Sequence, residues 1–497
     1  MIVRHREIGF ANGRQGAARR TAGKLAAMLL AAGLLLPWLL SASAAAETGK
    51  GTLMLAQNQG TVRSVVEFEA TGLNPNKPAK LIWVTVDGSY ELDGIYSFVG
   101  QRYMEREEVA LAGTTDRVGR WSGSFKVPEG FGGDHTVYVR QDGERLAQNV
   151  YFVRPTFKMS PESGPVGTEI TIEAEGIGWT TMESNWQLTY DNKFTGLISA
   201  VSTNGKATAK IRAAGPAGKH TLTIWHGYRG AAYLNHQQAP TAYLPVPTFE
   251  FEVTDGAADL TNAVEPVPAG GGGVVVPELR NKPNVKVAVS RDSGAVGDPV
   301  TLTAEGLPTG KPVELVWNTM AGSRVSGTGF AEKQIALGRS ATDGEGKLTY
   351  PFAIPEDLGG VPHRIDVKVG GVVYGQAYVG IVPSIVGMEP ASGPAGTAVE
   401  ITLQGVGWTE FDNAFYMTYD NAYTGYMCGF NSQGTVKFTV VASGEPGTHL
   451  IDLYPGIYQG RQTTPNVYLA PQLTYGEDHP GTRIPAIRMS FNVTEES

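Results

Sequence analysis

Apolar and polar residues alternate in four short segments of the chain, and each segment is followed closely by a glycine. The segments are Val66–Ala70 before Gly72, Ile170–Ala174 before Gly176, Val300–Ala304 before Gly306 and Val399–Leu403 before Gly405. An apolar residue at every second position places one face of a β-strand against a core and the other face in water. The pattern therefore predicts four half-buried strands at corresponding places in four repeated segments.

A second alternating segment follows in each repeat and begins with a histidine: His135–Val139, His220–Ile224, His363–Val367 and His449–Leu453. The first two histidines are 85 residues apart (220 − 135) and the last two 86 (449 − 363), which suits modules of about the immunoglobulin-like size. Each histidine shares a strand face with the apolar residues two and four places later. We therefore expect a structural imidazole at the rim of each core, in preference to a metal ligand or a general base.

Three motifs return at a constant offset of 229 residues, which is the difference 408 − 179 and also 419 − 190. They are Ser163-Gly-Pro, Gly178-Trp179 and Thr189-Tyr-Asp-Asn192, which recur as Ser392-Gly-Pro, Gly407-Trp408 and Thr418-Tyr-Asp-Asn421. At the same offset the single cysteine, Cys428, corresponds to Ser199. A constant offset over this span indicates a duplicated folding unit.

Turn sequences such as Asp87-Gly88 and Asn204-Gly205 separate the strands, and no long amphipathic helix follows the N-terminal region. We predict an all-β chain of four immunoglobulin-like β-sandwich modules in two duplicated pairs. These are the first to fourth modules, at residues 50–155, 156–255, 284–383 and 384–495. Residues 256–283 contain several prolines and the run Gly270–Gly273, so we expect a linker that leaves the pairs some freedom of orientation.

The opening Ser163-Gly-Pro-x-Gly-Thr168, the Tyr-Asp-Asn turn and the Gly-x-His before a late strand resemble bacterial immunoglobulin-like modules of the IPT/TIG type. The resemblance is good for residues 156–255 and 384–495 and looser for 50–155 and 284–383. It implies binding, spacing or adhesive units of exported proteins that have no catalytic centre. The shared motifs mainly encode turns, so they specify the fold better than the role.

The N-terminal region has the features of a secretory signal peptide. Residues 1–46 carry six basic side chains and one acidic one, then the apolar run Leu25–Leu40, then small residues up to Ala46. The apolar run is short for a membrane-spanning helix of about 20 residues, and Pro37 interrupts it, which favours cleavage over a permanent anchor. We expect a protein that is secreted, periplasmic or on the cell surface, with no membrane span after cleavage.

The charge and cysteine content exclude several classes of function. Removing residues 1–46 leaves 34 basic residues (40 − 6) and 47 acidic ones (48 − 1), a net charge of −13. An acidic surface repels phosphate backbones, so no nucleic-acid partner is expected. One cysteine allows neither an intramolecular disulfide nor a cysteine-based metal cluster.

The aromatic residues of the second and fourth modules are the candidate ligand-binding groups. They include Trp179, Tyr190, Trp408, Tyr419 and Tyr423, and exposed rings of this kind can stack on sugars or anchor a protein partner. The alternative is that the rings, above all the two tryptophans that follow glycine, fill the cores.

Two aspartates of the repeated Tyr-Asp-Asn turns are weak candidates for calcium ligands. Asp191 and Asp420 offer the oxygen atoms that calcium prefers, but Asp-Asn also suits a hairpin turn. The dense acidic spacing of known calcium loops is absent from the sequence. We therefore favour turn formation over a metal site.

The sequence contains no nucleophile elbow, zinc-protease helix, phosphate-binding loop or haem-attachment motif, and it suggests no cofactor. We expect a non-catalytic, exported structural or adhesive protein whose partner is a cell-surface or extracellular polymer or protein. The alternative is a carbohydrate-binding protein that uses the aromatic faces of the second and fourth modules. A hydrolase with a hidden pair of carboxylates is a third hypothesis.

Overall fold

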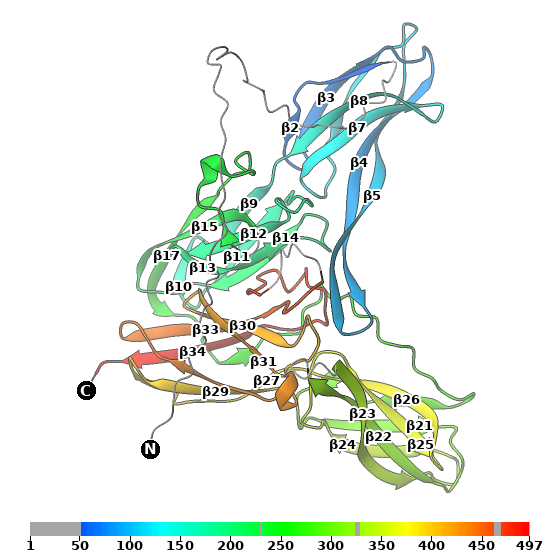
Figure 1. The fold of residues 1–497 in the computed structure, drawn as a ribbon, viewed down its shortest axis with the longest axis vertical. Helices are drawn as coiled ribbons and strands as arrows, with labels where there is room; N and C mark the ends of the chain where they lie inside the picture. The colour runs from blue at the N-terminus through cyan, green and yellow to red at the C-terminus, as the bar shows by residue number, and fades with distance from the viewer. Residues whose placement is uncertain (1–50, 229–230, 324–328, 462–468, 497) are drawn as a thin grey trace, which may run out of the picture. The chain divides into compact units, whose positions relative to one another are not determined.

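Figure 1 shows the computed structural model of the chain, which describes residues 51–496 apart from 229–230, 324–328 and 462–468. These residues are almost entirely β-structure, with two short 3-10 helices, η1 (His236–Gln238) and η2 (Phe430–Ser432). The predicted all-β fold of immunoglobulin-like sandwiches is confirmed. We keep the module names for the corresponding groups of strands, while the number of independent modules stays a prediction. The predicted signal peptide, residues 1–46, lies outside the described residues.

The first module contains β1 (Thr52–Leu55), β2 (Gln59–Gly60), β3 (Val65–Thr71), β4 (Pro78–Asp93), β5 (Ser97–Thr114), β6 (Trp121–Lys126), β7 (Gly133–Gln141) and β8 (Glu144–Val153). They form a three-stranded sheet in the order β1-β3-β6 and a five-stranded sheet in the order β2-β8-β7-β4-β5. β4 and β5 pair along their whole length as a long antiparallel hairpin (Figure 1).

The second module contains β9 (Thr156–Ser160), β10 (Ser163–Val166), β11 (Glu169–Glu175), β12 (Asn185–Tyr190), β13 (Lys193–Ser199), β14 (Ala207–Arg212), β15 (Gly218–Tyr228), β16 (Ala231–Ala232) and β17 (Thr248–Ala257). One sheet has the order β14-β11-β9. The other has the order β10-β17-β15-β12-β13, with β16 paired to β15, so β13 is an edge strand.

The third module contains β19 (Lys286–Val289), β20 (Ser293–Gly294), β21 (Pro299–Glu305), β22 (Pro312–Ser323), β23 (Gly329–Ala341), β24 (Leu348–Ala353), β25 (His363–Val369) and β26 (Val372–Ile381). Its sheets have the orders β19-β21-β24 and β20-β26-β25-β22-β23, the same arrangement as in the first module.

The fourth module contains β27 (Ser384–Glu389), β28 (Ser392–Pro394), β29 (Ala398–Gln404), β30 (Ala414–Tyr419), β31 (Ala422–Cys428), β32 (Val436–Val441), β33 (Gly447–Gly456) and β34 (Ile487–Thr494). One sheet has the order β27-β29-β32. The other has the order β18-β34-β33-β30-β31, with β28 also paired to β34, and it includes the short strand β18 (Ala263–Val264) from the expected linker.

The alternation that predicted the strands appears in the structure as alternating burial. In β3 the side chains of Val66, Phe68 and Ala70 are buried, and the residues between them are exposed. Burying a Val or Phe side chain contributes roughly 1.5–3 kcal/mol, so strands of this pattern are held by their inner faces. The corresponding strands β11, β21 and β29 bury their alternate residues in the same way.

The four repeated histidines pack against aromatic rings inside their modules. The pairs are Trp83–His135, Tyr190–His220, Trp317–His363 and Tyr419–His449, with ring centroids 4.4, 5.4, 4.5 and 5.5 Å apart. In each of these four histidines both ring nitrogens face oxygen atoms of the chain, as where His135 lies 2.9 Å from two backbone carbonyls. These contacts give each imidazole the structural role expected from the sequence.

The segment 256–283 does not have the freedom expected of a flexible linker. β18 pairs antiparallel with β34, and further along Gly272 and Gly273 donate to backbone carbonyls of residues 479 and 481 at 2.9 and 3.1 Å. Val274 packs against buried aromatic residues that include Phe411. The prolines and glycines of this segment therefore allow it to follow the surfaces of its neighbours, with which it forms hydrogen bonds and small apolar contacts.

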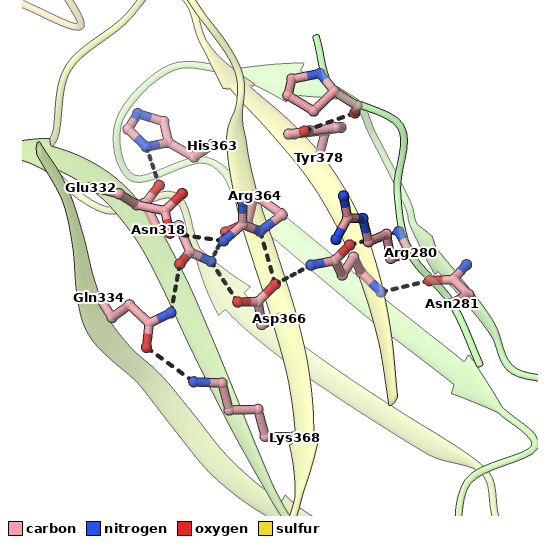
Figure 2. A network of polar contacts seen from close by, with 12 residues as sticks. Arg280, Asn281, Asn318, Glu332, Gln334, His363, Arg364, Asp366, Lys368 and Tyr378 are labelled. Carbon is pink, nitrogen blue, oxygen red and sulfur yellow. Dashed lines mark hydrogen bonds and ion pairs between the residues drawn. The ribbon is translucent and has the colours of Figure 1, made fainter. Parts of the chain in front are cut away.

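The end of the same segment is held on the third module by the polar network in Figure 2. Asp366 lies at its centre, is buried, and accepts hydrogen bonds from Asn318, Arg364 and Gln376 at 3.1, 2.9 and 2.7 Å. Gln376 in turn accepts from the backbone N–H of Arg280 at 2.7 Å. The polar cluster on the outer face of this sheet thus binds the end of the segment 256–283, which leads into the third module.

The long hairpin of the first module also contacts the fourth. Tyr90 donates to the Asp478 carboxylate at 3.0 Å, and the backbone N–H of Phe98 donates to Glu410 at 2.8 Å. The side chains of Phe98 and Phe411 share a small buried cluster. The two halves are therefore joined by direct contacts as well as by the segment between them, which corrects the expectation of beads on a linker.

Candidate functional site

The two Tyr-Asp-Asn motifs form equivalent hairpin turns, between β12 and β13 and between β30 and β31. Asp191 and Asn192 have φ values of 48° and 64°, and Asp420 and Asn421 have 46° and 60°. Two successive residues with positive φ are typical of the type I′ turn, in which Asp and Asn are favoured. The turn interpretation of these motifs therefore agrees with the backbone.

Each turn aspartate also binds the histidine of its own module. Asp191 Oδ2 lies 2.6 Å from His220 Nδ1, and its Oδ1 accepts from the backbone N–H of Thr221 at 3.0 Å. The other nitrogen of His220 lies 2.8 Å from the carbonyl oxygen of Pro216. The carboxylate thus fixes the start of β15 against the turn.

The fourth module repeats this arrangement 229 residues later. Asp420 lies 2.5 Å from His449 Nδ1 and accepts from the N–H of Leu450 at 2.9 Å, while His449 Nε2 lies 2.9 Å from the carbonyl of Glu445. Only a doubly protonated imidazole can donate to both acceptors. The hydrogen bond to Asp420 raises the pKa of His449, because it stabilises the charged ring more than burial destabilises it.

A pocket of about 600 Å³ lies between these two turns and is lined by Tyr190, Asp191, His220, Asp420 and His449. The structure therefore brings three predicted site residues from two modules to one place. Both oxygens of each aspartate accept hydrogen bonds from the chain itself, which leaves them poorly placed as calcium ligands. Within the described residues no group of three or more His, Cys, Asp or Glu side chains could hold a metal ion.

The two predicted tryptophans lie where neighbouring modules meet. The ring of Trp179 is half-buried, 5.0 Å from His135 and 6.1 Å from Phe131. Trp408 is 1% exposed and packs 5.2 Å from Phe330. The buried face of Trp408 is not available for stacking on a ligand, which corrects the expectation that this ring forms part of a binding surface.

The three predicted tyrosines do not form one exposed platform. Tyr190 is 2% exposed and donates to a backbone carbonyl at 2.8 Å, so it belongs to the core. Tyr419 is half-buried and stacks on His449. Tyr423 is half-buried between Phe194 of the second module and Tyr416 of the fourth. The expectation of one aromatic ligand-binding face on each module therefore does not fit these positions.

A group of four charges, of which Arg212, Asp452 and Arg488 are buried and Glu265 is partly exposed, connects the second module, the fourth module and the segment between the halves; the sequence did not reveal it. Arg212 of β14 lies 2.5 Å from Asp452 of β33, and it also donates to the carbonyl of Met489 at 2.7 Å. Arg488 of β34 lies 3.5 Å from Asp452 and 2.7 Å from Glu265. Two cations and two anions balance one another, as buried charges require.

The apolar contact around this charge group also crosses between modules. The core of the second module includes Tyr454, Leu473, Tyr475 and Ala486 of the fourth. The backbone of Leu197 in the edge strand β13 pairs with the segment at Gln472 as a parallel bridge. The second and fourth modules thus share part of one hydrophobic core.

Two further carboxyl groups occupy equivalent positions at the joints between modules, because 412 − 183 is also 229. Glu183 is buried beside Gly133 and accepts a hydrogen bond from Tyr243, and Asp412 is buried beside Gly360. Burial raises the pKa of Asp412 to about 6, even though its carboxylate accepts from two backbone N–H groups. A carboxyl residue five positions after each repeated Gly178 or Gly407 is a signal that could have pointed to these joints.

No protein-family model matches the chain, and no curated protein matches it. Among solved structures, Salmonella alpha-2-macroglobulin reacted with methylamine is 9% identical, with a TM-score of 0.18, over 90% of this chain and 31% of that one. A tetra-tandem repeat from the extending region of a large adhesion protein is 11% identical, with a TM-score of 0.19, over 90% and 99%. Escherichia coli alpha-2-macroglobulin activated by porcine elastase is 8% identical, with a TM-score of 0.15, over 89% and 43%. At TM-scores this low, the likenesses carry no argument about role.

Proposed function

We propose that the chain is a non-catalytic, exported protein with a structural or adhesive role at the cell surface or in the extracellular space. The buried charges Arg212, Asp452 and Arg488, together with the partly exposed Glu265, support this role most directly. They join segments that are far apart in the sequence, so that a force applied to one module is passed to another through packed contacts. A protein that spaces or anchors a binding face needs this kind of mechanical continuity.

The titratable groups that come together in the pocket between the second and fourth modules have structural partners. The Asp191–His220 and Asp420–His449 pairs each hold a turn against a strand. A general base or nucleophile, in contrast, must direct its reactive atom toward a substrate. The geometry of the pairs therefore favours a structural role over catalysis.

The localisation part of the proposal is tested by fractionating cells that produce the chain and determining its N-terminus by mass spectrometry. We expect a mature form that begins near residue 47 in the secreted, periplasmic or surface fraction. A matched version without residues 1–46 should stay in the cytoplasm. An unprocessed full-length chain in the cytoplasm would contradict export.

The adhesive part is tested by measuring attachment of these cells to protein-coated and polysaccharide-coated surfaces, with and without the gene for the chain. We expect loss of the chain to reduce attachment to at least one surface or to weaken the cell envelope. A substrate turnover that one Asp or Glu substitution abolishes would overturn the non-catalytic assignment. If loss of the chain changed neither attachment nor envelope strength, the structural and adhesive role would be overturned.

No helix among the described residues is long and apolar enough to cross a membrane.

A further inference from the structure

The joint between the first and second modules and the joint between the third and fourth are built alike. The N–H of Gly132 donates to the carbonyl of Ile177 at 3.0 Å, and at the other joint the N–H of Gly359 donates to the carbonyl of Val406 at 3.0 Å. A Cβ atom on either glycine would lie 1.8 Å from the carbonyl oxygen of a glycine in the adjoining module. The two joints can therefore be compared group by group.

At the joint between the first and second modules, the side chain of Tyr243 binds the buried carboxyl group. The Tyr243 hydroxyl donates to Glu183, and its ring meets that of Phe152 edge to face, with the centroids 5.4 Å apart. Arg154 donates to the carbonyl oxygen of Tyr243 at 3.4 Å. Tyr243 is 47% exposed, so this side of the joint faces solvent.

At the other joint, the ring of Phe152 has no counterpart. Phe152 of β8 lies opposite Gln59 of β2 as Gly380 of β26 lies opposite Ser293 of β20, so a glycine takes the place of the phenylalanine. A Cβ atom on Gly380 would come no closer than 3.4 Å to its nearest neighbour. The backbone therefore leaves room for a side chain that the sequence does not supply.

The ring of Tyr243 is also missing from the other joint. Residues 242–245, Ala-Tyr-Leu-Pro, precede β17, and residues 482–485, Thr-Arg-Ile-Pro, precede β34. In both strands the phenylalanine that pairs with the repeated histidine follows this proline by six residues (251 − 245 and 491 − 485), which fixes the alignment. Arg483 thus takes the place of Tyr243, and it is exposed.

The described residues leave a cavity of about 490 Å³ at this joint, bounded by the third module, the fourth module and the segment 256–283. Both replacement residues line it, as does Asp412, the counterpart of Glu183. Asp412 is 1% exposed, and its Oδ2 lies 3.4 Å from the hydroxyl of Thr482, a long hydrogen bond. The apolar part of the wall includes Val267, Val274, Ile381, Phe415 and Ile484.

We propose that this cavity binds a phenolic ring, from a tyrosine of a partner polypeptide or from a small phenol, whose hydroxyl donates to the Asp412 carboxylate. The duplicated joint binds the same chemical group within the chain, through Tyr243 and Glu183. Binding sites for small groups have volumes of about 300–1,000 Å³ and combine apolar walls with a few polar atoms. This inference goes beyond the proposed structural or adhesive role and does not depend on it.

The hydrogen-bonding state of Asp412 explains why a phenol is preferred to a plain aromatic ring. Its Oδ1 accepts from two backbone N–H groups, whereas its Oδ2 has the long contact with Thr482. A buried carboxylate oxygen is stabilised by each added donor, because the donor replaces the water that burial removed. A hydroxyl group on the bound ring supplies such a donor.

The test is a titration of residues 47–497, labelled at isoleucine methyl groups, followed by NMR. The probes are p-cresol and toluene, which differ only in the hydroxyl group, and N-acetyltyrosinamide and N-acetylphenylalaninamide, which make the same comparison for a side chain on a peptide. The methyl signals of Ile381 and Ile484, which line the cavity, report both the place of binding and the dissociation constant.

We expect p-cresol to shift these two signals and to bind at least about tenfold more tightly than toluene, because only the phenol can donate to Asp412. The same preference within the peptide-like pair would assign the site to a tyrosine of a partner polypeptide. A preference within the p-cresol pair alone would assign it to a small phenol.

Three variants connect the preference to the cavity. Asp412→Asn should reduce it to about threefold or less, because an uncharged amide is a weaker acceptor. Gly380→Phe supplies the ring that Phe152 provides at the other joint and should abolish binding of p-cresol and toluene. Gly387→Phe on β27 is the matched control and should keep binding, because a Cβ atom there would meet nothing within 4 Å.

Equal affinity for p-cresol and toluene, or no shift at Ile381 and Ile484 with any probe, would overturn the inference. A tenfold preference that survives Asp412→Asn, or binding that survives Gly380→Phe, would place the ring elsewhere and would also overturn it. The localisation and attachment measurements use no phenol. They therefore separate a failure of this inference from a failure of the proposed function.

Discussion

Replacement of Arg212 by methionine tests whether the second and fourth modules are joined through a buried ion pair. Arg212 is 8% exposed and Asp452 is 1% exposed, and the guanidinium contacts the carboxylate through two nitrogens at 2.5 and 3.3 Å. Arg212→Met keeps most of the side-chain volume but removes the charge. Asp452 would then retain only Arg488, 3.5 Å away, as a charged partner.

The expected loss of stability follows from this burial. Removing one partner of a buried ion pair costs about 3–5 kcal/mol, because the remaining charge is left without full compensation. An exposed pair contributes only about 0–1 kcal/mol. Lys210 lies two residues earlier on β14 and forms an exposed pair with Glu169 at 2.8 Å, so Lys210→Met is the matched control.

The assay is urea unfolding of residues 47–497, followed by circular dichroism at pH 7. We expect Arg212→Met to lower the free energy of unfolding by about 3–5 kcal/mol, and Lys210→Met by less than about 1 kcal/mol. The loss from Arg212→Met should be similar in low and high salt, because salt screens buried pairs weakly. Equal, small effects of the two substitutions would refute the buried contact between modules.

Three further predictions concern single positions. Burial raises the pKa of Asp412 from 3.8 to about 6, so ionisation of this group opposes folding progressively above about pH 4. Asp412→Asn should therefore raise the free energy of unfolding by about 3 kcal/mol at pH 7 but not at pH 4, and an equal effect at both pH values would contradict this. Because the pKa of His449 is raised, its pairing with Asp420 stabilises the fold fully below about pH 6.5, and this stabilisation is lost as the pH rises through the raised pKa. His449→Gln should flatten the dependence of stability on pH in that range, and an unchanged dependence would count against the pair. Gly196→Ala should cost about 1–3 kcal/mol in urea unfolding because its Cβ would lie 2.6 Å from the carbonyl oxygen of Pro471, and unchanged stability would contradict this contact.

The local pattern of the sequence was enough to predict the strands and turns. Alternation at Val66–Ala70 became β3, and the Asp-Asn motif at Asp191 became a hairpin turn with positive φ. These features depend on near neighbours in the chain. Side-chain periodicity and turn geometry are therefore visible without knowledge of the partners.

Contacts between distant segments were not predictable in the same way. Arg212 and Asp452 are 240 residues apart, and the sequence around neither residue contains a motif that indicates its partner. The duplication offered one signal, since Arg212 corresponds at the offset of 229 to the exposed Val441. A charged residue whose counterpart is apolar indicates that the two copies have different surroundings.

The expectations that failed did so because composition does not report burial. A tryptophan follows glycine in both copies of the motif, and sequence alone did not decide between a surface ring and a buried one; the structure buries Trp408. Glycine and proline in residues 256–283 suggested a free linker, but β18 and the bonds at Gly272 and Gly273 hold it. Backbone groups in such a segment form hydrogen bonds wherever a surface offers partners.

Amide hydrogen exchange, resolved by residue with NMR, tests most directly whether the second and fourth modules are joined along the edge strand β13. The amide groups of Leu197 and Leu473 should exchange slowly, because each donates to a carbonyl across the contact between modules. Fast exchange at Leu197 and Leu473 would contradict the account.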